Sequence, residues 1–458
     1  MSVRTLVMLA SMLAVSAHVA AQSPLRLATS IAAQSQNSGQ QPTPTPTPTP
    51  RPTPTPKPTP APKPTPKPKA APPPKPKAAP AKPATPRPTS SATPENRPEK
   101  PEAPPPAEYL FPRMDDGRLP IVPTAHGFYP AVGTVYPGSK LAFGGGWRQD
   151  HGPGSFVDGK AMWSIANYKR AEVTGVSAHH FEDRVDFGGR IGWLDAPRLP
   201  FFGLGPDSDE DARASFRLKE TYVEGAAIVR PAPWVLARAG VGYDAFVEDT
   251  GRGSHPPVDT RFTPLTAPHL AESPAFVTLT GSATFLWLAS PGYSRDGGLY
   301  RIGYQSYSRT DGGGETFGIL RNEIAQHLPL REGRAVLSVR ARTESAIVGA
   351  DQVPFFLLPS LGGGNTLRGY YTDRFRDVHS LLFTGEWRWL IKPKFLDVAV
   401  FSDAGTVGPH LSSLGFQHMS VDYGFGVRLH SKVATILRMD VVHGSEGFGL
   451  VFTTAPPF

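Results

Sequence analysis

The sequence predicts an all-β protein, a transmembrane antiparallel β-barrel of sixteen strands that is preceded by a disordered proline-rich segment. Three observations predict this class. The chain opens with an export signal. After residue 107 it alternates between apolar and polar residues over segments of roughly ten to sixteen residues. Finally, the sequence contains no window of about 18 apolar residues that would form a transmembrane helix.

Residues 1–21 have the form of a signal peptide. Arg4 supplies a positive charge, the stretch from Thr5 to Val15 is almost entirely apolar or small, and small residues precede a cleavage site before Gln22. The apolar stretch is too short for a membrane-spanning helix, so we expect export and removal of this segment. The chain has no cysteine, which excludes a lipoprotein anchor, a disulfide framework and a thiolate metal site.

Residues 22–106 are predicted to be a disordered Pro/Lys/Thr-rich periplasmic linker. The stretch from Pro42 to Pro106 holds 28 of the 53 prolines, and no aromatic residue precedes Tyr109, so no core can form. In polyproline II conformation these residues would extend to roughly 200 Å, at about 3.1 Å each. Two roles stay open: a semi-rigid spacer, or a polycationic strut that binds the anionic cell wall, peptidoglycan, or a periplasmic partner.

The formal net charge of +8 belongs to this linker. From Pro42 to Pro106 there are eleven Lys or Arg against three Glu, and Arg4 and Arg26 are also basic, so residues 107–458 carry a net charge of −2. A nucleic-acid-binding domain concentrates basic residues on a folded face. Nucleic acid is therefore not an expected partner.

Residues 107–458 are predicted to form the barrel. Alternating segments separated by Gly-, Pro- and Asp-rich turns indicate fifteen strands. These are 139–149, 157–168, 172–182, 185–195, 214–230, 234–248, 275–288, 298–309, 315–328, 334–346, 377–391, 395–405, 419–430, 433–443 and 447–454. Because single-chain bacterial barrels have an even number of strands, we expect the sixteenth within residues 119–136.

The apolar faces of the last strands favour a barrel in lipid over a soluble sandwich, although alternation alone fits both. In residues 421–430, for example, five apolar or aromatic residues oppose Asp422, Arg428, His430 and two glycines. The chain also ends on an aromatic residue that shares the parity of the apolar face before it. The residues that we expect to act as a C-terminal insertion signal are Phe448, Leu450, Phe452 and Phe458.

Two short segments carry a more specific pattern. Residues 361–376 read LGGGNTLRGYYTDRFR and residues 400–405 read VFSDAG. Both resemble signature motifs of the bacterial surface antigen superfamily, the BamA/TamA-like outer-membrane barrels. Residues 201–208, FFGLGPDS, are similar to a recurrent segment of that family.

The resemblance implies a loop lock. In the family, an Arg-Gly-Phe/Tyr tip lies on an outer loop that folds back into the barrel, and a Phe-x-Asp-x-Gly segment lies on a strand two after that loop. The order and spacing match here. The residues of the implied loop-lock motif are Arg368, Gly369, Tyr370, Phe401, Asp403 and Gly405.

Elementary physics supports the pairing. Asp403 and Glu386 lie on the polar faces of neighbouring predicted strands, and an uncompensated carboxylate in an occluded lumen is costly. The guanidinium of Arg368 can meet a carboxylate as a bidentate pair. Gly369 would let the backbone turn tightly, and Tyr370 would supply a packing surface. The alternative is that these charges line a solvated pore without mutual contact.

No catalytic, metal or cofactor site is expected. The chain has no Gly-x-Ser-x-Gly nucleophile elbow. His179 and His180 are adjacent to Glu182 and Asp183, but consecutive strand residues point to opposite faces and cannot share a metal. Gly312 to Gly314 lack a following Lys-Ser/Thr and indicate a hairpin tip rather than a phosphate loop. We therefore expect no enzyme and no cofactor.

Two functions follow for a barrel in the bacterial outer membrane with its N-terminal arm in the periplasm. The loop-lock resemblance favours assistance in inserting or translocating polypeptides, with lipid, client polypeptides and barrel-assembly machinery as partners. The family's assembly members carry compact periplasmic docking domains before the barrel, which residues 22–106 cannot form. That difference favours a pore, or a structural anchor tied to the cell wall by the basic arm.

Overall fold

The computed structural model describes residues 126–453, apart from 289–291, 332, 393–394 and 432–434. The predicted signal peptide, the predicted linker and residues 107–125 of the predicted barrel domain lie outside the described residues. So does Phe458, the last residue of the predicted insertion signal. Among the described residues, no helix is long and apolar enough to cross a membrane.

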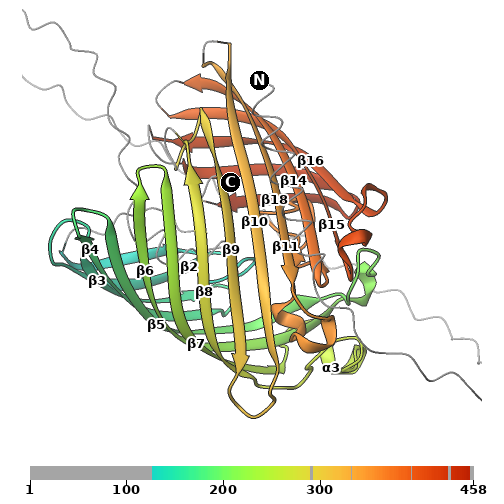
Figure 1. The fold of residues 1–458 in the computed structure, drawn as a ribbon. Coiled ribbons are helices and arrows are strands. Elements are labelled where there is room, and N and C mark those ends of the chain that lie inside the picture. Colours follow the sequence, from blue (N-terminus) through green and yellow to red (C-terminus); the bar gives the residue numbers. More distant parts are fainter. Residues whose placement is uncertain (1–125, 289–291, 332, 393–394, 432–434, 454–458) are drawn as a thin grey trace, which may run out of the picture. The chain divides into compact units, whose positions relative to one another are not determined.

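One antiparallel sheet of sixteen strands curls into a barrel, and every strand pairs with its neighbours along the chain (Figure 1). Its strands are β1 (His126–Gly133), β2 (Ala142–Asp150), β3 (Phe156–Ser164), β4 (Lys169–His180), β5 (Val185–Phe201), β6 (Ala214–Ala232), β7 (Val235–Thr250), β8 (Ala275–Leu286), β9 (Gly297–Arg309), β10 (Thr316–Leu330), β11 (Ala335–Ala346), β14 (His379–Lys392), β15 (Leu396–Gly408), β16 (Ser420–His430), β17 (Thr435–Gly444) and β18 (Gly447–Thr453). The predicted fold class is confirmed, and β1 supplies the sixteenth strand within the expected residues. In the described part of the chain, no ladder joins β1 to β18.

The strands alternate between an inner and an outer face, as the period of two requires. Outward side chains are apolar and exposed, for example Trp163, Ile191 and Phe425, of which 59%, 56% and 60% is accessible. Inward side chains are largely polar and many are buried, including Glu386 and Asp403 at 0%. An apolar exterior around a polar interior is the arrangement of a transmembrane barrel.

The two ends of the barrel differ in their connections. At one end, which we call the short-turn end, strands are joined by short turns such as residues 233–234 and 331–334. At the other, the long-loop end, connections reach residues 251–274 and 347–378. The long-loop end also carries the short helices α3 (Val258–Arg261), η1 (Glu210–Ala212), η2 (Ala350–Gln352), η3 (Phe355–Leu357), η4 (Leu411–Ser413) and η5 (Phe416–His418).

An aromatic cluster packs these loops onto the ends of the central strands. Phe355 lies between Phe201 and Phe216, with ring centroids 4.9 and 4.8 Å away, and Phe356 packs against Phe246 with ring centroids 5.4 Å apart. Figure 1 shows α3 beside the orange helical segment near residue 355, and Phe355 N donates to Pro268 O at 3.0 Å. The cluster is apolar and buried, so it fixes the long loops across this part of the long-loop end.

Candidate functional site

The longest connection, residues 347–378, folds into the barrel lumen, and we call it the lock loop. It contains the short hairpin β12 (Ser360–Leu361) and β13 (Phe375–Arg376), which the sequence did not predict. The hairpin's apolar residues pack against inward residues of β14 and β15. This buried cluster consists of Leu361, Leu367, Tyr370, Phe375, Leu382 and Val407.

Two glycines allow the backbone of the lock loop to turn tightly. Gly362 has a φ of +123°, and a Cβ there would lie 2.1 Å from Tyr371 O. Gly363 has a φ of +90°. Residues with a side chain rarely adopt these angles, so the Gly-Gly pair is what allows the chain to reverse inside the lumen.

Arg368 occupies the centre of the site. Its Nε donates to Asp403 Oδ2 at 2.6 Å and its Nη2 to Asp403 Oδ1 at 3.1 Å, which is a bidentate pair. Its Nη1 donates to Glu386 Oε2 at 3.3 Å and to Asp440 Oδ2 at 3.4 Å. The guanidinium carbon lies 3.4 Å from the ring centroid of Phe401, so the ring covers the face that carries no donors.

Two further arginines complete a buried ion cluster. Arg428 donates through Nη2 to Glu386 Oε2 at 2.7 Å and through Nη1 to Asp440. Arg438 Nε lies 3.3 Å from Asp440 Oδ2, and its Nη2 donates to the lock-loop carbonyl of Gly364. The ion cluster is thus three arginines and three carboxylates, each with at most 2% of its side chain exposed: Arg368, Arg428, Arg438, Glu386, Asp403 and Asp440.

Gly369 is needed because another chain segment passes close to it. Its amide donates to Asp422 Oδ2 at 2.9 Å. A Cβ at this position would lie 2.7 Å from Asp422 Cβ and 3.0 Å from Gly444 N, while its φ is not in the left-handed region. Gly369 lies in the turn of residues 367–370, where Tyr370 N donates to Leu367 O at 3.2 Å, and the close approach to β16 and β17 leaves no room for a side chain there.

Tyr370 and Gly405 also take part in the contact between the lock loop and the barrel wall. The Tyr370 hydroxyl donates to Val421 O at 3.2 Å and lies 3.1 Å from Ser445 Oγ. A Cβ on Gly405 would lie 2.8 Å from Leu361 Cδ1 and 3.0 Å from Leu381 O, so a side chain at this position would displace the side chain of Leu361 in the hairpin. The structure brings the six residues of the predicted motif together with the seventh predicted residue, Glu386, and their contacts differ from the alternative of separate charges around a solvated pore.

Four charged residues of the site were missed by sequence reasoning. The sequence placed Asp422 and Arg428 on the polar face of their strand but did not assign them to the lock. Arg438 and Asp440, which are buried on β17, were not assigned to it either. The signal that could have found them is the repetition of charges at inward positions on adjacent strands. The C-terminal residues Phe448, Leu450 and Phe452 point outward and are 83%, 68% and 63% exposed; their role in insertion stays a prediction.

Arg374 ties the lock loop to two other parts of the barrel. Its Nε donates to Glu446 Oε1 at 2.5 Å, in the turn between β17 and β18. Its Nη1 and Nη2 donate to Ser208 Oγ and O at 2.8 and 2.7 Å. The guanidinium lies 4.7 Å from the ring centroids of both Phe202 and Phe375. The segment 201–208, noted in the sequence only for its resemblance, is therefore one of the surfaces on which the lock loop rests.

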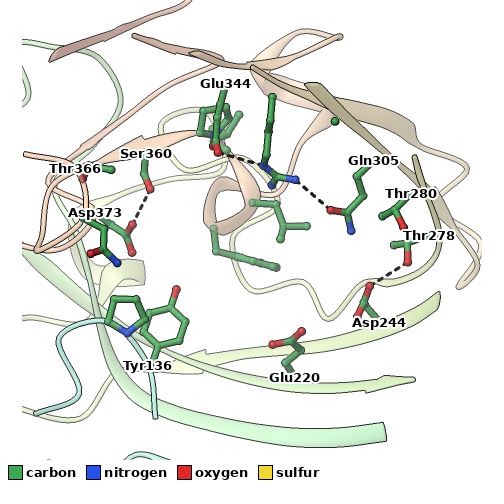
Figure 2. A pocket seen from close by; sticks show the side chains of 18 of the residues that line it. Tyr136, Glu220, Asp244, Thr278, Thr280, Gln305, Glu344, Ser360, Thr366 and Asp373 are labelled. Atoms are coloured by element: carbon green, nitrogen blue, oxygen red, sulfur yellow. Dashed lines mark hydrogen bonds and ion pairs between the residues drawn. The ribbon is translucent and has the colours of Figure 1, made fainter. Parts of the chain in front are cut away.

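A cavity of about 480 Å³ remains in the lumen between the lock loop and the strands from β4 to β11. Figure 2 shows Ser360 and Asp373 of the lock loop across the cavity from Gln305, Thr278 and Asp244. Arg321 spans its wall, donating to Glu344 Oε1 at 3.1 Å and to Gln305 Oε1 at 3.2 Å. The lining combines apolar side chains with polar side chains and charges of both signs, and its charged part suits water and ions.

The adjacent histidines do not form a joint site. His179 Nδ1 lies 3.1 Å from Asp183 Oδ1, whereas His180 Nε2 lies 2.8 Å from Ser177 Oγ. Among the described residues of 126–453, no group of three or more His, Cys, Asp or Glu is arranged to hold a metal ion.

The fold and the lock define a class: a sixteen-stranded transmembrane barrel whose longest loop is held in the lumen by buried ion pairs. No protein-family model and no curated protein matches the chain. Among solved structures, BamA from Haemophilus ducreyi lacking POTRA domains 1–3 aligns with a TM-score of 0.53 at 16% identity, over 71% of this chain and 69% of that one. CdiB from Acinetobacter baumannii aligns with a TM-score of 0.45 at 9% identity, over 74% of this chain and 57% of that one.

The chain therefore has the BamA-type outer-membrane barrel fold. The resemblance to the BamA/TamA-like barrels, predicted from two short motifs, is confirmed at the level of the fold. No docking domain precedes β1 in the part of the chain that the structure describes, which starts at residue 126.

Proposed function

We propose that this protein assists the insertion or translocation of polypeptides at the bacterial outer membrane, through a barrel held in its resting state by the lock loop. The observation that supports this most strongly is the buried ion cluster, which joins the loop to β14, β15, β16 and β17 at once. The work would be binding and conformational change, with no covalent chemistry. Lipid, client polypeptides and barrel-assembly machinery are the proposed partners.

The geometry favours a regulated barrel over a permanently open pore. The lock loop fills one side of the lumen, and the aromatic cluster holds the long loops over the central strands. The remaining cavity of about 480 Å³ has the size of a small-molecule site, so a polypeptide would pass only after the loop has moved. Barrels of this type have short periplasmic turns, so the short-turn end and the N-terminal arm are proposed to face the periplasm.

The experiment that tests this proposal uses a disulfide as a reversible lock. A Cβ on Gly364 would lie 2.9 Å from Val451 Cγ1, which brings Cβ atoms at positions 364 and 451 within disulfide range. The chain has no other cysteine to interfere. The variant carrying Gly364→Cys and Val451→Cys would be placed in lipid vesicles, and folding of an unfolded eight-stranded barrel protein would be followed on gels by its heat-modifiable migration.

We expect the reduced variant and the parent chain to accelerate folding of the client relative to empty vesicles, and the oxidised variant to lose that acceleration. Oxidised and reduced samples are the same molecules, so protein content and orientation are matched. Equal client folding rates in protein-containing and empty vesicles would contradict the proposal.

A second candidate function, an ion-conducting pore or structural anchor, is favoured by the charged cavity and by the basic arm. Steady conductance of the parent chain in planar bilayers, without any effect on client folding, would support it. Retention of the full chain on purified peptidoglycan would support the anchor.

A further inference from the structure

The connection between β8 and β9 reaches across the short-turn end of the barrel. Its residues 292–295, which we call the inner strap, contact strands far from β8 and β9 in the sheet. Gly292 O accepts hydrogen bonds from Thr435 N at 2.8 Å and from Thr435 Oγ1 at 3.2 Å, at the start of β17. In the sheet order, β10, β11, β14, β15 and β16 lie between β9 and β17, so the strap reaches a strand that is far from its own in the sheet.

Tyr293 anchors the strap inside the lumen. Its ring stacks on His430 of β16, with centroids 3.9 Å apart and an interplanar angle of 8°. Its hydroxyl donates to Asp397 Oδ2 of β15 at 2.5 Å, and His430 Nε2 lies 3.5 Å from Asp397 Oδ1. Tyr293 is only 4% exposed although it belongs to a connection and not to a strand. Residues in connections are usually exposed, so such burial indicates that Tyr293 is bound at a specific position in the lumen.

The strap is also joined to the ion cluster. Arg388 of β14 donates to Ser294 O, and its guanidinium carbon lies 5.4 Å from the Tyr293 ring. Arg388 Nε is in turn 3.8 Å from Glu386 Oε1, the carboxylate that Arg368 and Arg428 share. On the other flank, Arg295 donates to the carbonyl of Gly333 in the turn between β10 and β11.

We propose that the inner strap is a second latch, which closes the short-turn end of the lumen beneath the ion cluster. The lock loop enters from the long-loop end and the strap lies at the opposite end, and both bear on β14 to β17. Opening a continuous path through the barrel then requires both to release. This proposal does not depend on whether the barrel serves clients or conducts ions.

The test measures ionic current through the purified full-length protein in planar bilayers. Releasing the lock loop alone, with Arg368→Ala, should leave the mean current low because the strap still closes the lumen. Tyr293→Ala removes the seat on His430 and Asp397. In combination with Arg368→Ala it should raise the current several-fold above the sum of the single effects. Tyr293→Phe keeps the stacking and should give a smaller increase.

The matched control is Tyr300→Ala, which removes a tyrosine of neighbouring β9. Its hydroxyl donates to Asn322 Oδ1 of β10 at 3.2 Å, and its ring stacks on Phe285 of β8 with centroids 6.1 Å apart. We expect it to leave the current unchanged in the Arg368→Ala background. Heat-modifiable migration of every variant shows that the barrel is folded before currents are compared.

A cross-link keeps the test independent of folding differences. Because Gly292 and Thr435 are hydrogen-bonded through their backbones, Gly292→Cys and Thr435→Cys would fix the strap in the cysteine-free chain. In a protein that also carries Tyr293→Ala and Arg368→Ala, oxidation should suppress the current and reduction should restore it. Currents that are the same in the oxidised and reduced protein, or no gain from Tyr293→Ala, would overturn the proposal.

Discussion

A single guanidinium, that of Arg368, joins the lock loop to three strands of the wall. It meets the carboxylates of Asp403, Glu386 and Asp440 while its flat face rests on Phe401. Of these contacts, the sequence predicts the first two, because the motif and the parity of two neighbouring strands place them. It does not predict Asp440, 72 residues away from Arg368, because alternation fixes which face a residue occupies but not which loop will reach it.

At the scale of the residue, we predict a strong coupling between Arg368 and Asp403. Replacing Arg368 with Ala strands buried carboxylates, and breaking a buried pair on one side typically costs about 3–5 kcal/mol. A pair in a wet lumen would lose only about 0–1 kcal/mol. The 2% and 0% exposure of the two side chains favours the larger value. Urea titration of the folded fraction in bilayers, for Arg368→Ala, Asp403→Ala and both together, measures the coupling energy.

The more exposed pair of Arg148 and Asp150 is the matched control, since each side chain is 24% exposed. There we expect a coupling within the error of the measurement. Additive effects of Arg368→Ala and Asp403→Ala would show that these residues are ordinary lumen lining.

At the scale of the element, the strands were predictable and the hairpin in the lumen was not. Each strand of the barrel wall alternates between inward and outward residues over at least seven positions, which is long enough for the alternation to be recognised in the sequence. β12 and β13 have two residues each, so they offer no period. β5 continues to Phe201 rather than ending near residue 195, because a register shift between Ala196 and Leu199 accommodates Pro197 at an irregular point of the ladder.

The turn between β17 and β18 is tied to the lock loop by Glu446 and Arg374, and this tie makes a prediction about pH. Burial raises the pKa of Glu446, although the neighbouring Arg374 guanidinium opposes the shift. A carboxyl group whose pKa is higher in the folded state than in the unfolded state favours folding when it is protonated. Its contribution is fully present below the unfolded pKa, about 4.3, and is lost as pH rises through the folded pKa.

Glu446→Gln should therefore keep the stability at pH 7 equal to the parent or raise it, and should remove this part of the pH dependence. Urea midpoints between about pH 4 and pH 8 check the sign. Glu272, in the connection of residues 251–274, is the matched control because its pKa is shifted in the opposite direction. Burial would raise its pKa, but hydrogen bonds from His269 and Arg309 outweigh burial and lower it. Glu272→Gln should cost stability at pH 7. Destabilisation by Glu446→Gln equal to that of Glu272→Gln would contradict this prediction, because it would show that the ion pair with Arg374 outweighs burial at Glu446, as the pairs with His269 and Arg309 do at Glu272.

At the scale of the whole molecule, the order of the strands in the sheet follows their order in the chain. The contacts that close the lumen, in contrast, join residues that are far apart in the sequence. When every strand of a barrel pairs with its sequence neighbours, the order of the strands can be predicted from the positions of the turns alone. The lock loop, the aromatic cluster and the inner strap join residues that are far apart in the sequence, such as Ser208 and Arg374, which are separated by 166 positions. Such contacts depend on the three-dimensional shape of the whole barrel, which no local sequence pattern encodes.

The last prediction concerns the proline-rich arm, whose role was left open by the sequence. Deleting Pro42 to Pro88 removes nine of the eleven basic residues of the stretch from Pro42 to Pro106, and no aromatic or other large apolar residue. Because a stretch of this composition contributes nothing to a core, the heat-modifiable transition of the barrel should stay at the temperature of the parent. If the arm is a polycationic strut, the deletion should at the same time reduce retention on purified peptidoglycan.

A second variant separates charge from length. Replacing the same nine basic residues with Gln keeps the arm's prolines but removes the attraction to an anionic wall. A strut that acts through charge loses retention in both variants, whereas a spacer loses it in neither. A lower transition temperature in the deletion would show instead that the barrel domain begins within the arm, and that the boundary at residue 107 is wrong.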